Sequence, residues 1–291
     1  MRPPSFEFLR PSTAAEAISA TGEYGEGMFY SGGTELLLAM KLRVIHTERL
    51  VDIKRIPDLN NIVLVDPGMI EIGARCTHKQ IEHDDIVQKH LPALSRLCAN
   101  VANIRVRSTG TIGGNLCFGE PHADPPTMLA ALDAQLRLVG TNGERVVLAG
   151  DFIQDEFETV REPDELLTRI RIPIPNGPVT YRRFRHGERP SVNVAMVWFL
   201  ESGARTIARA RIQVGALGPR PQQLESVEAA LAGAPVRDAK RLIEAVLPAA
   251  LDDLDVTGDR HGSAEYKRHL AGVLLRRNAA EAETACEEQR Q

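Results

Sequence analysis

Aromatic residues and cysteines are both scarce in this 291-residue sequence. Aromatic residues make up 4%, with one Trp and four Tyr, so a site that stacks rings on a flat ligand has few to use. The cysteines are Cys76, Cys98, Cys117 and Cys286, and no two of them form a C-x-x-C pair. No zinc or iron–sulfur ligand set is therefore predicted, and scattered free thiols are typical of a reducing compartment.

Long apolar runs and a large excess of one charge are also missing. No stretch approaches the roughly 18 consecutive apolar residues of a membrane-spanning helix, so no membrane span is expected. The N-terminal MRPPSFEFLRPSTAAEA has no apolar signal-peptide core, and we therefore expect a cytoplasmic protein. The net charge of -4 offers no general attraction for a phosphate backbone, which argues against a nucleic-acid partner.

The order of apolar and turn segments predicts three domains. Hydrophobic residues (43%) and charged residues (25%) occur in the proportions of a globular enzyme. Strands and helices alternate over 1–57 and again over 58–176, and the second stretch ends at a linker rich in Pro and Gly. Over 177–291 strands come first and helices follow, which is typical of a small α+β domain.

Local signals predict individual elements. Ser12 and Thr13 precede a helix expected over 14–20. Asp66-Pro67-Gly68 is a strong turn signal between two strands. The basic stretch 103–110 is interpreted as a loop, and whether it is simply solvated or receives an anionic partner stays open. The polar tail 281–291 is expected to fray.

Two pairs of adjacent glycines carry the chemical information. Ser31-Gly32-Gly33-Thr34 follows a brief apolar strand and leads into a helix expected over 35–43, and Thr111-Ile112-Gly113-Gly114-Asn115 comes much later. Adjacent glycines permit positive φ and let N–H groups converge in a concave nest that binds anions. We interpret both motifs as loops that hold one diphosphate from two sides. The alternative, that each is only a turn, is left open by the residues alone.

Signatures of other chemistries are missing. No G-x-G-x-x-G follows a strand and no G-x-x-x-x-G-K-[ST] occurs, so a dinucleotide would not bind in the Rossmann manner. His122 and Asp124 lack further ligands at usable spacing, and no metal site is predicted. No pair of catalytic carboxylates and no Ser-His-Asp order is supported. Cys117 is interpreted as a small buried hydrophobic residue.

The glycine motifs in context resemble a known family. YSGGTELLLAMK, paired with RVRSTGTIGGNLCFGEPHADPP, is similar to the FAD-binding subunit of molybdenum hydroxylases. That family includes the medium subunit of aerobic carbon monoxide dehydrogenase and the flavin domain of xanthine dehydrogenase. The resemblance also covers LVDIKRIPDL, EIGARCTH and HGSAEYKRHLAGVLLRR, and so extends over nearly the whole chain.

The resemblance implies a fold and a cofactor site. The fold is of the vanillyl-alcohol-oxidase type, in which two α/β subdomains (1–57 and 58–176) hold FAD and a C-terminal α+β domain (177–291), an antiparallel sheet with helices, closes over it. By position, the family's cofactor contacts fall on Ser31, Gly32, Gly33, Thr34, Glu35, Leu36, Thr111, Gly113, Gly114, Asn115, Asp124, Leu167 and Arg185.

Each part of that set has an implied role. The residues of the two glycine motifs would enclose the diphosphate. Asp124 would accept hydrogen bonds from hydroxyls of the ribitol or adenosine part. Leu167 would pack near the flavin rings, and Arg185 would place a cation near the flavin, where it stabilises negative charge on the reduced ring.

The function implied by the resemblance is that of an oxidoreductase subunit. A large subunit with a molybdopterin cofactor would oxidise the organic substrate, and a small subunit would carry electrons through [2Fe–2S] clusters to FAD in this chain. FAD would pass them to an external acceptor such as NAD⁺, O₂ or a carrier. The expected assembly is a dimer of heterotrimers, with no residue of this chain acting as an acid–base catalyst. Two alternatives are a free-standing flavin oxidoreductase acting on its own small substrate and a non-catalytic assembly module without flavin.

Overall fold

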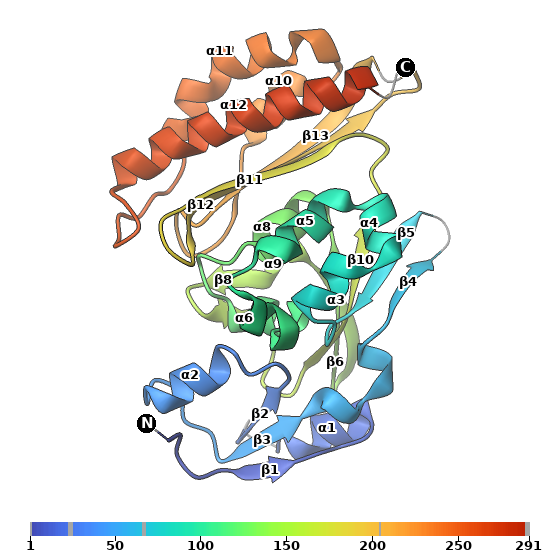
Figure 1. Ribbon diagram of the computed structural model, residues 1–291, viewed down its shortest axis with the longest axis vertical. Helices are drawn as coiled ribbons and strands as arrows, with labels where there is room; N and C mark the ends of the chain where they lie inside the picture. The colour runs from blue at the N-terminus through green and yellow to red at the C-terminus, as the bar shows by residue number, and fades with distance from the viewer. Residues whose placement is uncertain (1, 23–25, 66–67, 204, 289–291) are drawn as a thin grey trace. The chain divides into compact units, whose positions relative to one another are not determined.

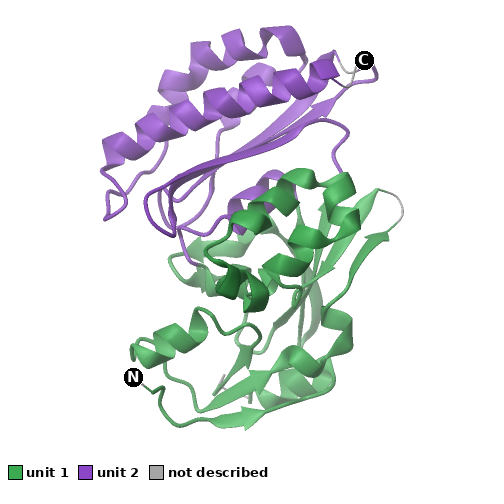
Figure 2. Cartoon of the chain, in the orientation of Figure 1, with its two compact units in different colours: residues 1–119, 134–172 green, residues 120–133, 173–291 purple. Residues whose placement is uncertain are grey.

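A computed structural model describes residues 2–22, 26–65, 68–203 and 205–288 (Figure 1). The chain forms two compact units (Figure 2). The first unit contains residues 1–119 and 134–172, and the second contains residues 120–133 and 173–291. Of the expected turn Asp66-Pro67-Gly68, the first two residues lie outside the described residues.

The first unit begins with a small parallel sheet. Its strands lie in the order β1 (Glu7–Leu9), β3 (Arg49–Asp52) and β2 (Gly27–Tyr30), and both pairings are parallel. The connecting helices are α1 (Ala14–Ala20) and α2 (Leu36–Lys41), as Figure 1 shows. The expected start of α1 is confirmed, because the Thr13 side chain accepts a hydrogen bond from the N–H of Glu16.

A second sheet of five strands completes the first unit. Its order is β4-β5-β10-β6-β7, and the pairs β4/β5, β10/β6 and β6/β7 are antiparallel. The strands are β4 (Ile62–Val65), β5 (Met69–Gly73), β6 (Gln135–Gly140), β7 (Gly143–Leu148) and β10 (Leu166–Pro173), with a separate pair, β8 (Ile153–Asp155) and β9 (Glu158–Thr159). The helices are α3 (His78–His83), α4 (Asp85–His90), α5 (Pro92–Asn100), α6 (Ile104–Thr109), α7 (Ile112–Phe118) and α9 (Ala149–Phe152). Two short 3₁₀ turns, Ile53–Arg55 and Pro57–Leu59, connect the two sheets along the chain.

The two sheets of the first unit share part of one hydrophobic core. Ala17 and Ile18 of α1 belong to the same buried cluster as Val51 of β3 and Leu166 of β10. Burial of apolar side chains against one another is the main favourable term in folding. This common cluster explains why residues on both sides of Pro57 form one compact unit.

The second unit is built on an antiparallel sheet. The central strand β12 (Pro190–Leu200) pairs with β11 (Val179–Arg185) and with β13 (Thr206–Gly215). Two short strands, β14 (Gln222–Gln223) and β15 (Ala234–Pro235), also pair with β13. The helices are α8 (Pro125–Ala131), α10 (Glu225–Leu231), α11 (Ala239–Asp252) and α12 (Ala264–Glu288), with a 3₁₀ turn at Val236–Asp238.

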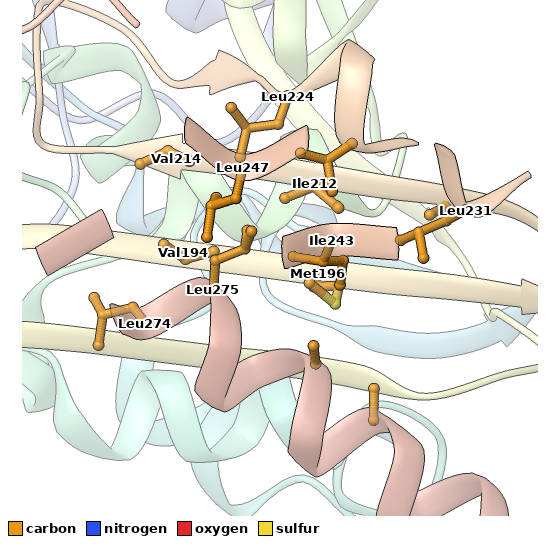
Figure 3. Packing of buried hydrophobic residues seen from close by; sticks show 14 of the residues in the cluster. Val194, Met196, Ile212, Val214, Leu224, Leu231, Ile243, Leu247, Leu274 and Leu275 are labelled. Atoms are coloured by element: carbon orange, nitrogen blue, oxygen red, sulfur yellow. The ribbon is translucent and has the colours of Figure 1, made fainter. Parts of the chain in front are cut away.

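Helices cover both faces of β12. Val194 and Met196, two residues apart on one face, pack in a buried cluster with Leu247 of α11 and Leu275 of α12 (Figure 3). Helix α8 also packs on β12 and β13, and the Asn193 side chain, on the other face, donates to the carbonyl of Ala123. Successive side chains of a strand point to opposite faces, so a strand covered on both sides is buried along its length.

The structure differs from the sequence analysis in several elements. Residues 104–109 form helix α6 and not a loop, because the Asn103 side chain caps the N–H groups of Arg105 and Val106. Helix α12 continues to Glu288, so the tail is not frayed over 281–288. Strand β11 was not expected. Residues 120–133 group with the second unit because α8 covers its sheet; the three-domain division at 57 and 176 stays a prediction.

No helix in the described residues combines the length and apolar character that a bilayer crossing needs.

Candidate functional site

The first glycine motif joins β2 to α2 and packs closely against its neighbours. Gly33 has a φ of 70°, in the left-handed region that favours glycine. A Cβ at Gly33 would overlap the Tyr30 ring, and a Cβ at Gly32 would overlap the carbonyl of Thr109 at the end of α6. The second contact places the first motif against the backbone that leads into the second motif.

Backbone donors of the first motif are available to a ligand. Within the residues that the structure describes, the N–H groups of Gly32, Gly33 and Thr34 have no acceptor. The carbonyl of Gly33 accepts from the N–H of Leu37, which closes the turn into α2. Successive N–H groups without partners form the kind of concavity that binds anions. The first motif therefore has the local structure that the sequence analysis expected.

The second glycine motif is the first turn of a helix and not a loop. Thr111 is the N-cap of α7, and its Oγ1 accepts from the N–H of Gly114 at 3.1 Å. The N–H of Ile112 donates to the carbonyl of Cys76 at 3.0 Å, and that of Gly113 donates to the carbonyl of Ala74 at 2.9 Å. Three N–H groups that the sequence analysis offered to a ligand are therefore already used within the chain. The Thr111 hydroxyl keeps its own proton to donate.

The two glycines of α7 have different surroundings. A Cβ at Gly113 would lie 2.6 Å from both the Cβ and the carbonyl oxygen of Ala74, so this glycine permits α7 to pack on the end of β5. Gly114 is exposed, and a Cβ there would meet only Thr111 Oγ1, at 2.9 Å. Gly113 is thus required by packing, whereas Gly114 leaves the surface beside the N-cap uncovered.

Both motifs line one cavity of the first unit. The cavity has a volume of about 750 Å³. Its lining includes Ser31 and Gly32 from the first motif and Thr111 from the second. The remaining lining residues are Tyr30, Lys54, Asn60, Arg75, Thr77, Lys79, Gln80, His83, Ser108 and Thr109. Three of the residues predicted for the site are therefore brought together around one space. Other predicted residues lie beside it, either in the two motifs (Gly33, Thr34, Gly113, Gly114 and Asn115) or directly after the first one (Glu35 and Leu36).

The cavity wall is positively charged. Lys54, Arg75 and Lys79 line it, and none of its lining residues is Asp or Glu. Lys54 lies 4.5 Å from the centre of the Tyr30 ring and 3.6 Å from Asp52. Within the described residues, Arg75 and Lys79 form no ion pair. The sequence analysis missed these cations. Lys54 and Arg75 lie in the segments LVDIKRIPDL and EIGARCTH, which carry the family resemblance, and that was the available signal.

Two polar atoms of the cavity residues lack partners although they are buried. They are Ser31 Oγ and Arg75 Nε. Asn115 Oδ1, in the first turn of α7, is a third such atom among the predicted residues. Buried polar atoms almost always have a hydrogen-bond partner, because an unmade bond costs about 1–3 kcal/mol. Ser31 Oγ and Arg75 Nε can donate, and together with Arg75 and Lys79, which have no carboxylate partner in the described residues, they fit an anionic ligand with phosphate oxygens, whereas Asn115 Oδ1 is an acceptor and would need a donor.

Asp124 belongs to the second unit, where it is held by two side chains of β11. Its carboxylate is 5% exposed and accepts hydrogen bonds from the Tyr181 hydroxyl and the Arg183 guanidinium. Burial raises the pKa of Asp124, and Arg183 and Tyr181 act against that rise. Neither residue was predicted. Tyr181, Arg183 and Arg185 alternate along the chain, which places all three side chains on one face of a strand. The sequence analysis did not use this pattern because it did not predict the strand.

The last two predicted residues differ in exposure. Leu167 is 3% exposed in β10, where it pairs with Leu138 in the sheet of the first unit. Arg185 is exposed at the end of β11, beside an irregularity in its pairing with β12. Cys117 is partly buried, and burial raises the pKa of its thiol. No group of His, Cys, Asp or Glu side chains within the described ranges is placed to hold a metal ion.

Comparisons with known proteins define the class. Residues 4–175 match the family model described as FAD binding domain in molybdopterin dehydrogenase, and residues 180–282 match CO dehydrogenase flavoprotein C-terminal domain. The chain is 32% identical to the carbon monoxide dehydrogenase medium chain of Hydrogenophaga pseudoflava, over 98% of this chain and 100% of the relative. It is 27% identical to the xanthine dehydrogenase FAD-binding subunit of Escherichia coli O157:H7, over 96% of each chain.

A solved structure gives the same result. It is that of a carbon monoxide dehydrogenase from Hydrogenophaga pseudoflava that lacks the Mo-pyranopterin moiety of its molybdenum cofactor. It matches with a TM-score of 0.92 and 33% identity, over 98% of this chain and 100% of that chain. The family models and the fold define a flavoprotein of the α+β class. The chain belongs to the family of FAD-binding medium subunits of molybdopterin-dependent dehydrogenases, which are oxidoreductases.

Proposed function

We propose that FAD is held at the cavity of the first unit by the two glycine motifs. The observation that carries the proposal is that both motifs border one space, with cations and unpartnered buried donors and no carboxylate among its lining residues. Ser31 Oγ, the Thr111 hydroxyl and the N–H groups of Gly32 to Thr34 would donate to the diphosphate. Glu35, Leu36, Gly113, Gly114 and Asn115 complete the proposed enclosure.

The roles of the other predicted residues belong to the same proposal. Asp124 would accept a hydrogen bond from a sugar hydroxyl of the cofactor, since each carboxylate oxygen has more than one lone pair. Leu167 would pack near the flavin rings. Arg185, exposed and without an ion pair in the described residues, would stabilise negative charge on the flavin. FAD supplies the electron transfer, and the residues of this chain bind, orient and electrostatically tune it.

We further propose that the chain works as an electron-transfer subunit in a cytoplasmic complex. A large molybdopterin subunit would oxidise the organic substrate, and a small [2Fe–2S] subunit would deliver electrons to this chain, which would pass them to an external acceptor. The support is the likeness, over nearly the full length of each chain, to a protein named a medium chain and to one named an FAD-binding subunit. The proposed assembly is a dimer of heterotrimers.

The cofactor proposal is tested by flavin content. Full-length protein is expected to be yellow and to hold about one FAD per chain. Gly114→Val, which places a β-branched side chain on the uncovered surface beside Thr111, is expected to lose FAD while retaining its helical circular dichroism. Ala280→Val, at an exposed position of α12, introduces the same helix-weakening residue away from the cavity and should keep FAD. Unchanged flavin content in folded Gly114→Val would refute the assignment of the second motif.

The partner proposal is tested by co-purification. Affinity-tagged chain, expressed with its native complement of proteins, is expected to bring down one large molybdopterin-containing subunit and one small subunit with [2Fe–2S] clusters. Rapid reduction of the flavin by a small organic substrate, with the chain alone in solution, would instead support a free-standing flavin oxidoreductase.

A further inference from the structure

The cationic wall of the cavity provides more positive charge than the fold itself uses. Lys54 is partly compensated, because Asp52 lies 3.6 Å from its Nζ and the Tyr30 ring lies 4.5 Å away. Arg75 and Lys79 have no carboxylate partner within the described ranges, and Arg75 Nε is buried without an acceptor. Unpaired cations facing a common space repel one another, so this arrangement costs stability unless an anion completes it.

The three cations come from separate parts of the chain. Lys54 lies in the 3₁₀ turn after β3, Arg75 follows β5, and Lys79 lies in the first turn of α3. Thr77, Ser108 and Thr109 also line this wall, but their hydroxyls already donate within the chain, to Gln80 Oε1 and to the carbonyls of Ile104 and Arg105. The cations are therefore the groups that this wall leaves for a ligand, and several cations around one space fit a ligand group with two or more negative charges better than a neutral ring or a single carboxylate.

We propose that Arg75 and Lys79 are specificity-determining residues that recognise the ligand by the charge of its diphosphate, so that free nucleoside diphosphates compete with FAD for this cavity. The inference rests on the proposed function and adds a selection rule to it. Free ADP and inorganic diphosphate bind the flavin-free chain, whereas adenosine and riboflavin, which have no phosphate, do not displace FAD. Loading of the chain with FAD then depends on the ratio of FAD to free nucleoside diphosphates.

The experiment uses the full chain after removal of flavin. Titration calorimetry measures the affinity for FAD, ADP, AMP, adenosine and inorganic diphosphate, each at two salt concentrations. Arg75→Gln is expected to weaken ADP binding about tenfold, the value of one charge-assisted hydrogen bond at low salt. Lys79→Gln, at an exposed position, is expected to weaken it about threefold, because water and salt screen exposed charges. Both variants should show a shallower dependence of affinity on salt.

A matched control and separable outcomes complete the test. Arg55→Gln removes an exposed cation next to Lys54 that does not line the cavity, and it should bind ADP as the unaltered chain does. If the unaltered chain binds no FAD, the proposed function fails. If it binds FAD but ADP does not compete, or if Arg75→Gln and Lys79→Gln both bind ADP with unaltered affinity, selection by charge is refuted and the proposed function stands. Equal binding of adenosine and ADP would also refute it.

Discussion

The two adjacent glycines of α7 lead to a prediction with different outcomes for the same substitution. Gly113→Ala places a methyl group 2.6 Å from both the Cβ and the carbonyl oxygen of Ala74. Ala74 lies directly after a buried strand, so α7 must move away. That movement stretches the 2.9 Å hydrogen bond from the Gly113 N–H to the Ala74 carbonyl. Gly114→Ala meets only Thr111 Oγ1, a side-chain atom that can turn away by giving up its cap bond from the Gly114 N–H.

The magnitudes follow from these contacts. Overpacking costs about 1–3 kcal/mol and a weakened hydrogen bond about 0.5–1.5 kcal/mol, while replacing glycine by alanine in a helix returns about 0.5–1 kcal/mol. Gly113→Ala should therefore lower the free energy of unfolding by roughly 1–3 kcal/mol. For Gly114→Ala, the helix gain opposes a disturbed N-cap worth about 1 kcal/mol, so the net change should stay within about 1 kcal/mol.

Urea denaturation of the flavin-free full chain checks the pair. Circular dichroism follows the helices, and the comparison uses the midpoint and slope of the transition that contains α7. Without FAD the result reports on the fold alone. Equal destabilisation by the two substitutions, or a stable Gly113→Ala variant, would show that α7 does not pack on Ala74 as described.

Three further predictions concern ionisable groups. Lys267→Met should lower the free energy of unfolding by about 1–3 kcal/mol in thermal denaturation, because the Lys267 side chain is 1% exposed and its Nζ donates to Asp259 and to the carbonyl of Ala216. Unchanged stability would contradict these bonds. Burial raises the pKa of Asp259, but hydrogen bonds from Lys267, a backbone N–H and His122 outweigh it and lower the pKa from 3.8 to about 2. The resulting stability, about 1 kcal/mol after solvent screening, should be complete above pH 4 and lost as the pH falls toward 2; unfolding midpoints of Asp259→Asn should vary less over that range. Burial raises the pKa of the Cys76 thiol to about 11, so iodoacetamide at pH 8 should label Cys76 only after unfolding, and rapid labelling of the native chain would argue against its burial.

Local patterns predicted several elements because their causes are local. Helix α1 begins where Thr13 supplies a side-chain cap, and such a cap is visible in the sequence. Helix α7 was missed because adjacent glycines weaken helices. Its stability depends on the contact of Gly113 with Ala74, from a distant part of the chain. The glycine motifs are visible as local patterns in the sequence, but Arg75 and Lys79 are not. These two residues line the cavity only because the fold brings distant parts of the chain together.

The path of the polypeptide has a consequence for dissecting the protein. The chain leaves the first unit after Gly119, returns at Ala134 and leaves again after Ile172. A fragment that starts at Pro173 would lack α8 and would expose one face of β12, including Asn193. A single cut therefore yields no autonomous C-terminal half, and a soluble excised version needs residues 120–133 grafted back or a designed replacement for that helix.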